Sequence, residues 1–432
     1  MCDTLVAAPA ATADGAVLFA KNSDREPGEA QAVELCKGRE HRPGTILRAT
    51  WIEIPQARRT FRTVLCRPFW MWGAEMGAND QGVVIGNQAV FTRFDVPKSG
   101  LTGMDLVRIA LERAPTAADA MATIIDHLER FGQGGRCGYR HPNFRYHSSF
   151  IIADPGQAWV LETAGDFWAA RRVRTVWSLS NGLTIGANFD RISDGAVEFA
   201  VERGWAESKA KFRFDKAFGD PLMNFLAGAV ARRRCTMSDL SRHKPDLRVA
   251  HMIDALRNHG GRSPTKGIRM AAPCAHASWL PTRTAGQTVG SMVSRLGEDG
   301  QSHWLTGTSS PCLSVFKPVS LHGELGELGP RPAGRFDDKS LFWRHELFHR
   351  RALAAQMELP DQVRAELAEL RRREGKIDTD HPVELWKEHR RRVGTWADAI
   401  GGSRRRISPT SLFWQYQSWL DQMPLTSRGG GR

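Results

Sequence analysis

The sequence predicts an α+β protein, in which strands and helices come in separate blocks along the chain. Residues 1–95 are rich in segments that alternate apolar and polar side chains, a pattern typical of half-buried strands. Two helical segments follow, strand patterns return over 148–186, and mixed helices and strands come after them. A βαβ protein would change element type at every step, so this grouping favours α+β.

The first predicted element is a β-hairpin at the start of the chain. Residues 3–8 form a short apolar run, residues 12–15 (Thr-Ala-Asp-Gly) supply turn chemistry, and residues 16–20 form a second apolar run. The polar cluster 21–26 (Lys-Asn-Ser-Asp-Arg-Glu) ends this run. Because the second strand returns toward the chain start, this cluster is expected beside residue 2, although an ordinary solvated loop is the alternative.

The later elements follow from the same patterns. Residues 50–54 and 60–65 alternate as strands, and two helices are expected to begin at Thr102 and Thr116, each with a Thr cap and an Asp in its first turn. Strands are expected on both sides of the turn Asp154-Pro155-Gly156. The remaining predictions are helices around 193–203, 220–233 and 246–258 and strands at 287–295, 302–308 and 312–316.

The chain is predicted to have two parts. Residues 323–334 are rich in Gly and Pro and are interpreted as a connector. Beyond it, helices are expected near 339–358, 361–374, 382–399 and 409–421. We therefore predict a core domain over 1–322 and a helical extension over 335–432, packed on the core or on a sister subunit.

Composition indicates a soluble globular protein of a reducing compartment. The chain has 432 residues, 41% of them hydrophobic and 25% charged. It has no apolar run long enough for a bilayer and no secretory-signal pattern, so we expect a cytoplasmic protein without a membrane partner. Its seven scattered cysteines do not suggest a disulfide framework.

The net charge of +13 raises the alternative of a nucleic-acid binder. Basic clusters occur at 232–234, 371–373, 390–392 and 404–406. They are spread along the chain and no helix-turn-helix, zinc-finger or RNA-recognition pattern accompanies them. We therefore interpret them as solvated faces and expect no specific nucleic-acid partner.

No metal or other cofactor is predicted. Cys137 lies near His141, and Cys274 lies near His276. Neither pair repeats in the doubled CxxC or HxxxH spacing that is typical of zinc sites.

The strongest chemical signal is Cys2, which directly follows the initiator methionine. Cysteine is small enough for that methionine to be removed, and one residue would then carry both a thiol and a free α-amine. An amine with a pKa of roughly 7.7 to 8.0 can serve as a base near neutral pH, and N-terminal nucleophiles activated in this way are known. Lys21 beside the thiol would favour the thiolate, and Asp24 could orient the amine.

The chain resembles the secernin branch of the C69 dipeptidases, which are N-terminal nucleophile (Ntn) hydrolases related to penicillin V acylase and the bile-salt hydrolases. The resemblance begins with Cys-Asp-Thr-Leu-Val at 2–6 and Phe-Ala-Lys-Asn-Ser-Asp-Arg-Glu-Pro at 19–27. It continues at 79–90, 179–183, 275–278, 288–293 and 341–346. It implies a four-layer αββα sandwich and hydrolysis of an amide bond through an acyl-enzyme.

The resemblance also implies roles for individual residues. Cys2 is expected to be the nucleophile, and Asp24 is expected to hold its amine. Lys21 stands where the related acylases usually have an arginine. Asn87 and Asn181 are expected to stabilise the oxyanion and to orient the substrate. Arg25, Asn22 and His276 are expected to contact substrate. A second arginine expected later in the chain has no clear match; His276 is nearest in pattern, with Arg269 and Arg283 as neighbours.

The predicted function is therefore a cysteine amidohydrolase, or thiol protease, that cleaves small peptides in the manner of a dipeptidase. Two alternatives stay open. One is an acylase or acyltransferase acting on a fatty or aromatic amide, whose acyl pocket some of the fourteen tryptophans could line. The other is a non-catalytic relative that keeps the fold to bind a partner. A homo-oligomer is possible in each case.

Overall fold

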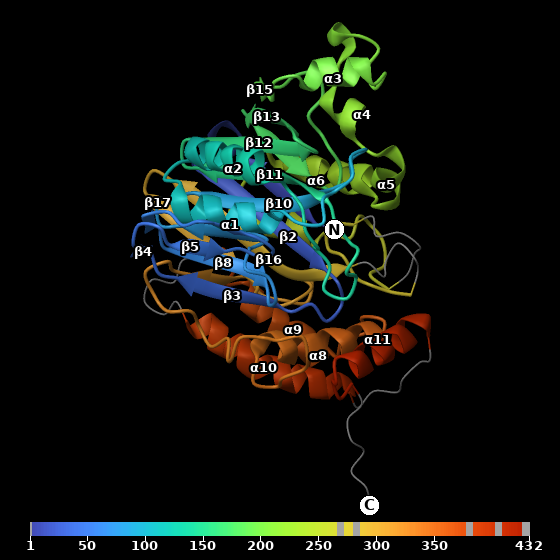
Figure 1. Cartoon of the computed structure of the whole chain (residues 1–432). Coiled ribbons are helices and arrows are strands. Elements are labelled where there is room, and N and C mark those ends of the chain that lie inside the picture. Colours follow the sequence, from blue (N-terminus) through green and yellow to red (C-terminus); the bar gives the residue numbers. More distant parts are fainter. Residues whose placement is uncertain (1, 266–271, 280–285, 377–382, 402–407, 426–432) are drawn as a thin grey trace, which may run out of the picture.

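The computed structural model describes residues 2–265, 272–279, 286–376, 383–401 and 408–425. Two antiparallel sheets form the centre of the molecule (Figure 1). In the described chain, the first has six strands in the order β14 (Val176–Leu179), β1 (Asp3–Ala7), β2 (Val17–Arg25), β16 (Gln287–Gly297), β17 (Gly300–Leu305) and β18 (Lys317–Val319).

The second sheet has eight strands among the described residues. Their order is β15 (Arg191–Ile192), β13 (Phe167–Val173), β12 (Gln157–Ala164), β11 (His147–Asp154), β10 (Val84–Val90), β9 (Met76–Asn79), β8 (Thr63–Pro68) and β3 (Gln31–Cys36). Two small ribbons, β4 (Arg39–Glu40) with β7 (Arg59–Thr60) and β5 (Ile46–Arg48) with β6 (Glu53–Pro55), extend from it.

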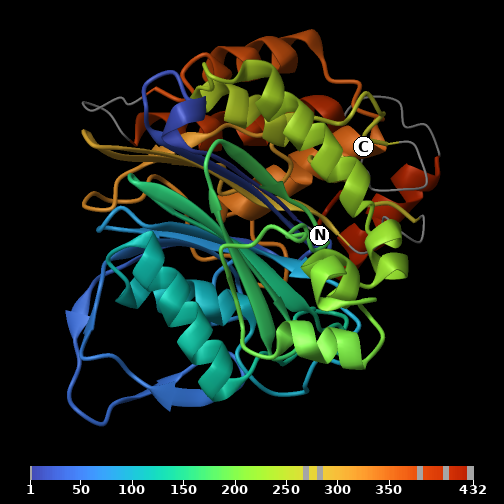
Figure 2. The ribbon, with the colours of Figure 1, turned by 90° about the horizontal axis from the view of Figure 1, so that it is seen from above.

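Helices cover the outer face of each sheet, which gives the four layers seen in Figure 2. α1 (Gly103–Arg113) and α2 (Ala117–Phe131) pack on the eight-stranded sheet through residues such as Leu106 and Ile124. α6 (Ala229–His243) and α7 (Val249–Arg257) pack on the six-stranded sheet through Leu240 and Ile253. A third apolar layer fills the space between the sheets. The predicted αββα sandwich is therefore confirmed.

The N-terminal hairpin forms as predicted, but its second strand is longer. Asp3 pairs with Asn22 and Thr4 with Lys21, so the chain start lies beside the polar cluster. The cluster is not a loop, because β2 continues through Arg25 and pairs with β16 on its other side. Its polar side chains are buried and find polar partners there, which removes the cost of placing them inside the protein.

The helix starts that the sequence predicts are also confirmed. The Thr102 side chain accepts from the Asp105 N–H, and the Asp105 carboxylate accepts from the Thr102 N–H, which together form a capping box. The Thr116 side chain caps α2 by accepting from the N–H of Asp119.

The strand expected over 312–316 is absent, and β18 starts only at Lys317. Ser310 has a φ of 52° and Pro311 follows it, so the chain bends before it can join the sheet.

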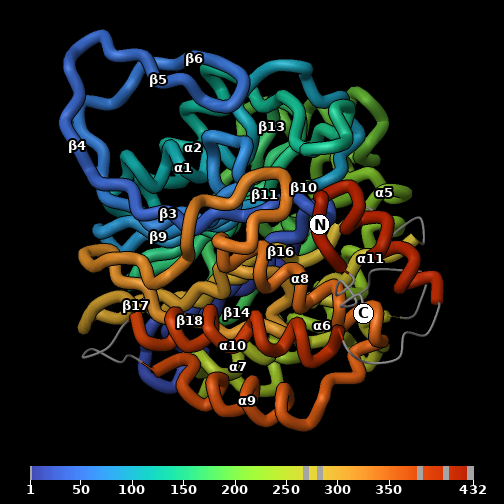
Figure 3. The backbone as a smooth tube through the Cα atoms, turned by 90° about the horizontal axis from the view of Figure 1, so that it is seen from below, coloured from blue at the N-terminus to red at the C-terminus, as the bar shows by residue number. Residues whose placement is uncertain are grey.

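The remaining helices lie at two places on the sandwich. α3 (Ala196–Glu202), α4 (Phe214–Phe218) and α5 (Pro221–Leu226) follow β15, and short 3₁₀ turns occur at Pro9–Ala11 and Lys209–Lys211. α8 (Leu341–Ala354), α9 (Asp361–Arg371), α10 (Glu384–Gly401) and α11 (Pro409–Leu420) form a layer across one end of the sheets (Figures 1 and 3).

This C-terminal layer shares the apolar core of the sandwich. Phe348, Trp386 and Trp396 belong to the same buried cluster as the residues between the sheets. The division of the chain at 322 and 335 stays a prediction. None of the described helices combines the length and the apolar character that crossing a lipid bilayer requires.

Candidate active site

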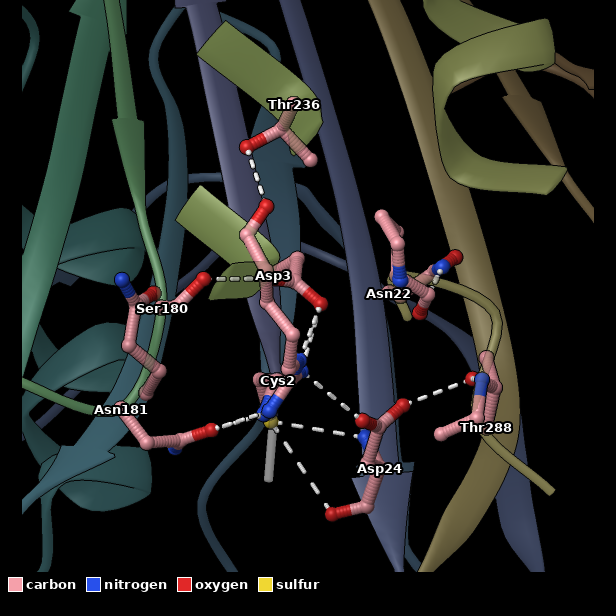
Figure 4. A network of polar contacts seen from close by, with 12 residues as sticks. Cys2, Asp3, Asn22, Asp24, Ser180, Asn181, Thr236 and Thr288 are labelled. Atoms are coloured by element: carbon pink, nitrogen blue, oxygen red, sulfur yellow. Dashed lines mark hydrogen bonds and ion pairs between the residues drawn. The ribbon is translucent and has the colours of Figure 1, made fainter. Parts of the chain in front are cut away.

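Cys2 lies directly before β1, between β2 and the loop that follows β14 (Figure 4). Its side chain is buried, with the residue only 4% exposed. Its backbone nitrogen donates to Oδ1 of Asn181 at 3.0 Å, and its Sγ accepts from the backbone N–H of Asp24 at 3.4 Å. Both functional atoms of the candidate nucleophile are therefore held by neighbouring elements.

Arg232, which the sequence analysis does not single out, joins these groups. Its guanidinium is fully buried on α6 and donates to the Asp3 carboxylate from Nε at 3.0 Å. It also donates from Nη2 to Oδ2 of Asp24 at 3.1 Å and from Nη1 to Oδ1 of Asn181 at 2.7 Å. One planar cation thus connects three residues around Cys2, which suits the multiple donors of arginine.

A signal for Arg232 exists in the sequence but is hidden by its neighbours. The residue belongs to the run 232–234, which reads as a solvated basic face. In α6 the buried residues are Ala229, Arg232, Thr236 and Leu240, and the last three are spaced by four. Helical spacing alone would have placed this arginine on the inner face.

Asp24 is the second ionic centre of the site. Its Oδ1 accepts a hydrogen bond from the Thr288 hydroxyl at 2.7 Å, and its Oδ2 is paired with Arg232. Burial raises the pKa of Asp24 to about 6, against the opposing effect of Arg232. This carboxylate is therefore charged at neutral pH and protonates in mildly acidic solution.

Lys21 and Glu75 set the charge near the thiol. Nζ of Lys21 lies 3.5 Å from Oε2 of Glu75, and the same oxygen is 3.8 Å from Sγ of Cys2. Burial raises the pKa of the Cys2 thiol; Lys21 lowers it, as expected, and Glu75 raises it. The net shift is upward, so the thiolate that the sequence analysis expects is not favoured. Glu75 precedes β9 without a sequence pattern that marks it.

Arg25 is committed to contacts within the protein. Its guanidinium donates to Glu29 at 2.6 Å, Glu75 at 3.0 Å, the Tyr146 hydroxyl at 3.0 Å and the Cys137 carbonyl at 2.5 Å. These bonds give Arg25 a role in fixing Glu75, and its predicted contact with substrate stays a prediction.

Asn22 is also satisfied by the protein. Its Oδ1 accepts from the Ser291 hydroxyl at 2.6 Å, and its Nδ2 donates to the carbonyls of Leu256 and Pro273 at 2.8 and 2.9 Å. These bonds fix Asn22 between β16 and the segment before it, and its predicted contact with substrate stays a prediction.

His276 faces a different set of side chains. Its ring nitrogen Nε2 lies beside His259, Cys274 and Cys312. A later arginine, Arg232, contacts the site at Asn181 and Asp24, and the substrate contact predicted for His276 stays a prediction. Arg269 and Arg283 lie outside the described residues.

The two asparagines differ in what their amide nitrogens can do. Nδ2 of Asn181 donates to the Ala89 carbonyl at 2.8 Å, and its oxygen holds the Cys2 nitrogen and Arg232. Asn87 lies within β10, and its Nδ2 contacts the thioether of Met104 at 3.3 Å. Its side chain points toward α1, whereas its neighbours Gly86 and Gln88 face Lys21 and Thr4, so Nδ2 of Asn87 lies on the face of β10 that is turned away from β1.

A separate cavity of about 1060 Å³ lies on the outer side of α6. Its apolar lining includes Leu183, Phe225, Val230 and Met237. Cys2 is not among the residues that line it. The cavity therefore begins near the loop that carries Asn181 but is not the nucleophile's own pocket.

No protein family model matches this chain. Among solved structures, it resembles penicillin V acylase from Agrobacterium tumefaciens with 10% identity and a TM-score of 0.40, over 74% of this chain and 86% of that one.

A variant of conjugated bile acid hydrolase from Clostridium perfringens is 12% identical with a TM-score of 0.38, over 71% of this chain and 88% of that one. The Caenorhabditis elegans ortholog of N-acylethanolamine-hydrolyzing acid amidase is 12% identical with a TM-score of 0.35, over 68% and 92%. At these values no residue role or substrate is transferred to this chain, and its chemistry rests on its own geometry.

Proposed function

We propose that this chain is a cysteine amidohydrolase that cleaves small peptides, as a dipeptidase does, with Cys2 as its N-terminal nucleophile. The observation that carries the proposal is the environment of Cys2. Its nitrogen is bound by Asn181, its sulfur is bound by the N–H of Asp24, and Arg232 links both partners in a buried cluster. Removal of Met1 turns that bound nitrogen into the α-amine.

The raised pKa of the thiol determines how the nucleophile would be activated. A protonated thiol must transfer its proton to a base before it attacks, and the α-amine of the same residue is within reach. The sulfur then bonds to the substrate carbonyl carbon, and the ammonium returns the proton to the leaving nitrogen as the C–N bond breaks. Water hydrolyses the resulting thioester and regenerates the thiol.

The asparagines are assigned separate tasks in this scheme. The oxyanion donor expected from the sequence is Asn87, whose Nδ2 would have to leave the Met104 thioether and turn toward β1 to serve in this role. Asn181 acts as a positioning residue that orients the amine through its oxygen. Asp24 and Arg232 keep Asn181 and the strand start in place.

A second candidate is an acylase acting on a fatty or aromatic amide. The cavity outside α6 keeps this alternative open, because Phe225 is 55% and Val230 is 69% exposed there. Cys2 does not line this cavity and several of its lining residues are basic, so the dipeptidase stays the leading proposal.

The experiment that tests the proposal compares two forms of one protein on a panel of dipeptides and N-acyl amines. The first form has lost Met1, as verified by intact mass; the second carries an N-terminal extension that ends in a protease site directly before Cys2. We expect the first form to hydrolyse dipeptides, the extended form to be inactive, and cleavage of the extension to restore activity.

Two outcomes of this comparison contradict the proposal. Full activity in the extended form would exclude the α-amine as the base. Turnover of N-acyl amines but not of dipeptides would replace the dipeptidase assignment with the acylase.

The pH dependence of kcat/KM should reveal both ionisations of the site. The α-amine must be neutral, which gives a slope of one in log kcat/KM below roughly pH 7.7. Asp24 has a pKa of about 6, above its usual range, so it loses its charge as the pH falls through that value. We expect the slope to increase to about two below pH 6. A slope that stays at one down to pH 4.5 would show that the charge of Asp24 is not needed.

A further inference from the structure

Four metal-ligating side chains from three separate segments meet beside the candidate active site. His259 follows α7, Cys274 and His276 precede β16, and Cys312 follows β17. One ligand atom from each of them lies within 4.8 Å of all the others. Cys274 and His276 are buried, and His259 and Cys312 are half-buried, so the group is enclosed but reachable from solvent.

The distances between these ligand atoms fit tetrahedral coordination of one metal ion better than they fit a set of hydrogen bonds. Nε2 of His276 lies 3.1 Å from Nε2 of His259, 3.5 Å from Sγ of Cys274 and 3.4 Å from Sγ of Cys312. A single imidazole nitrogen donates or accepts one hydrogen bond, so it cannot satisfy three such neighbours. Zinc bound at about 2.0–2.1 Å to nitrogen and 2.3 Å to sulfur places two nitrogens, or a nitrogen and a sulfur, about 3.3–3.6 Å apart in a tetrahedral site, and two sulfurs about 3.8 Å apart.

We propose that His259, Cys274, His276 and Cys312 bind one zinc ion. Two thiolates and two neutral imidazoles are a ligand set that zinc prefers, whereas calcium and magnesium require oxygen ligands. Each thiol releases its proton on binding, and the two thiolates balance the charge of the ion. Four protein ligands leave no open position, so the site is structural and is not a second catalytic centre.

The zinc ion would hold the segments that position Asp24. Ala275, between two of the ligands, accepts from the Thr288 N–H at 3.0 Å and donates to the Thr288 hydroxyl at 3.0 Å. Ser310, two residues before Cys312, donates to the Thr288 carbonyl at 2.8 Å. The Thr288 hydroxyl in turn donates to Asp24, as Figure 4 shows.

Asn22 adds a second connection, because its amide donates to the carbonyl of Pro273, directly before Cys274. The ion would therefore fix the position of the first residues of β16, which include Thr288. This positioning role rests on the proposed function, whereas zinc binding itself does not.

Sequence spacing does not predict this site. His259 lies 17 residues before His276, and Cys312 lies 36 residues after it. Only the fold brings the loops after α7 and β17 to the segment before β16. From its sequence, the chain is expected to bind no metal. This proposal replaces that expectation.

The test is the metal content of the full chain, purified without a histidine tag after growth in zinc-supplemented medium. We expect about one zinc ion per chain, and loss of that zinc in C312S and H276A. The matched control C235S removes a half-buried cysteine outside the cluster and should keep the zinc. C2A should keep it too, so a failure of the proposed catalysis would not affect this result.

A second measurement covers the case in which the cluster variants do not fold. The unmodified chain, freed of zinc by a chelator, is titrated with cobalt(II). We expect thiolate-to-cobalt and tetrahedral d–d absorption bands that saturate at one equivalent, and a melting temperature that falls on metal removal and recovers on addition. The proposal would be overturned if the purified chain contains no zinc and shows no such bands on titration with cobalt(II). A disulfide between Cys274 and Cys312 in freshly purified protein would also overturn it.

Discussion

Replacement of Cys2 by alanine is expected to lower turnover by at least about 10⁴-fold, because it removes the atom that forms the acyl-enzyme. The fold should persist, since the change deletes one sulfur atom and leaves the β1 pairing with β2 and β14 intact. We expect the free energy of unfolding to fall by about 1 kcal/mol. Steady-state kinetics and chemical denaturation of the same preparation check both statements.

The matched control for this variant is C235A. Cys235 is half-buried on α6 and has no role in the proposed chemistry, so its removal should leave turnover near the unmodified value. Activity retained in C2A would end the nucleophile assignment, and the non-catalytic binding protein would then be the leading interpretation. Loss of activity in both variants would point to a general defect in the preparation.

Replacement of Arg232 by methionine is expected to give the largest loss of stability. The guanidinium is the partner of two buried carboxylates, Asp3 and Asp24, and it also donates to Asn181. Removing one partner of a buried ion pair leaves uncompensated charge, which costs about 3–5 kcal/mol. Turnover should fall as well, because Asn181 and Asp24 lose the group that orients them around Cys2.

The control is R234M, two residues along the same helix. Arg234 is exposed, so its replacement should change the free energy of unfolding by less than about 0.5 kcal/mol. Denaturant titration of R232M, R232K and R234M measures the effect. R232K keeps the charge and loses the planar fork, so an intermediate loss is expected. An R232M protein as stable as R234M would contradict the ion-pair argument.

The sequence predicted well those helices and strands whose start or pairing depends on residues close together in the chain. Thr102 with Asp105 and Thr116 with Asp119 marked helix starts because a cap is a contact between residues three apart. The two apolar runs near the chain start, with turn residues between them, marked the hairpin that places Lys21 across from Thr4. The bend at Ser310 and Pro311 was missed, since a single positive φ leaves no periodic signal.

The sequence by itself determined which residue is the candidate nucleophile and which strand lies beside it, because both follow from position and short-range pairing. The tertiary structure decided the rest of the site. Arg232 reaches Asp3 over 229 positions of the chain, and Glu75 reaches the Cys2 sulfur over 73. Contacts at such separations depend on how sheets and helices pack. Burial is likewise a property of the packed molecule, so only the structure reveals that the pKa of the Cys2 thiol is raised despite Lys21.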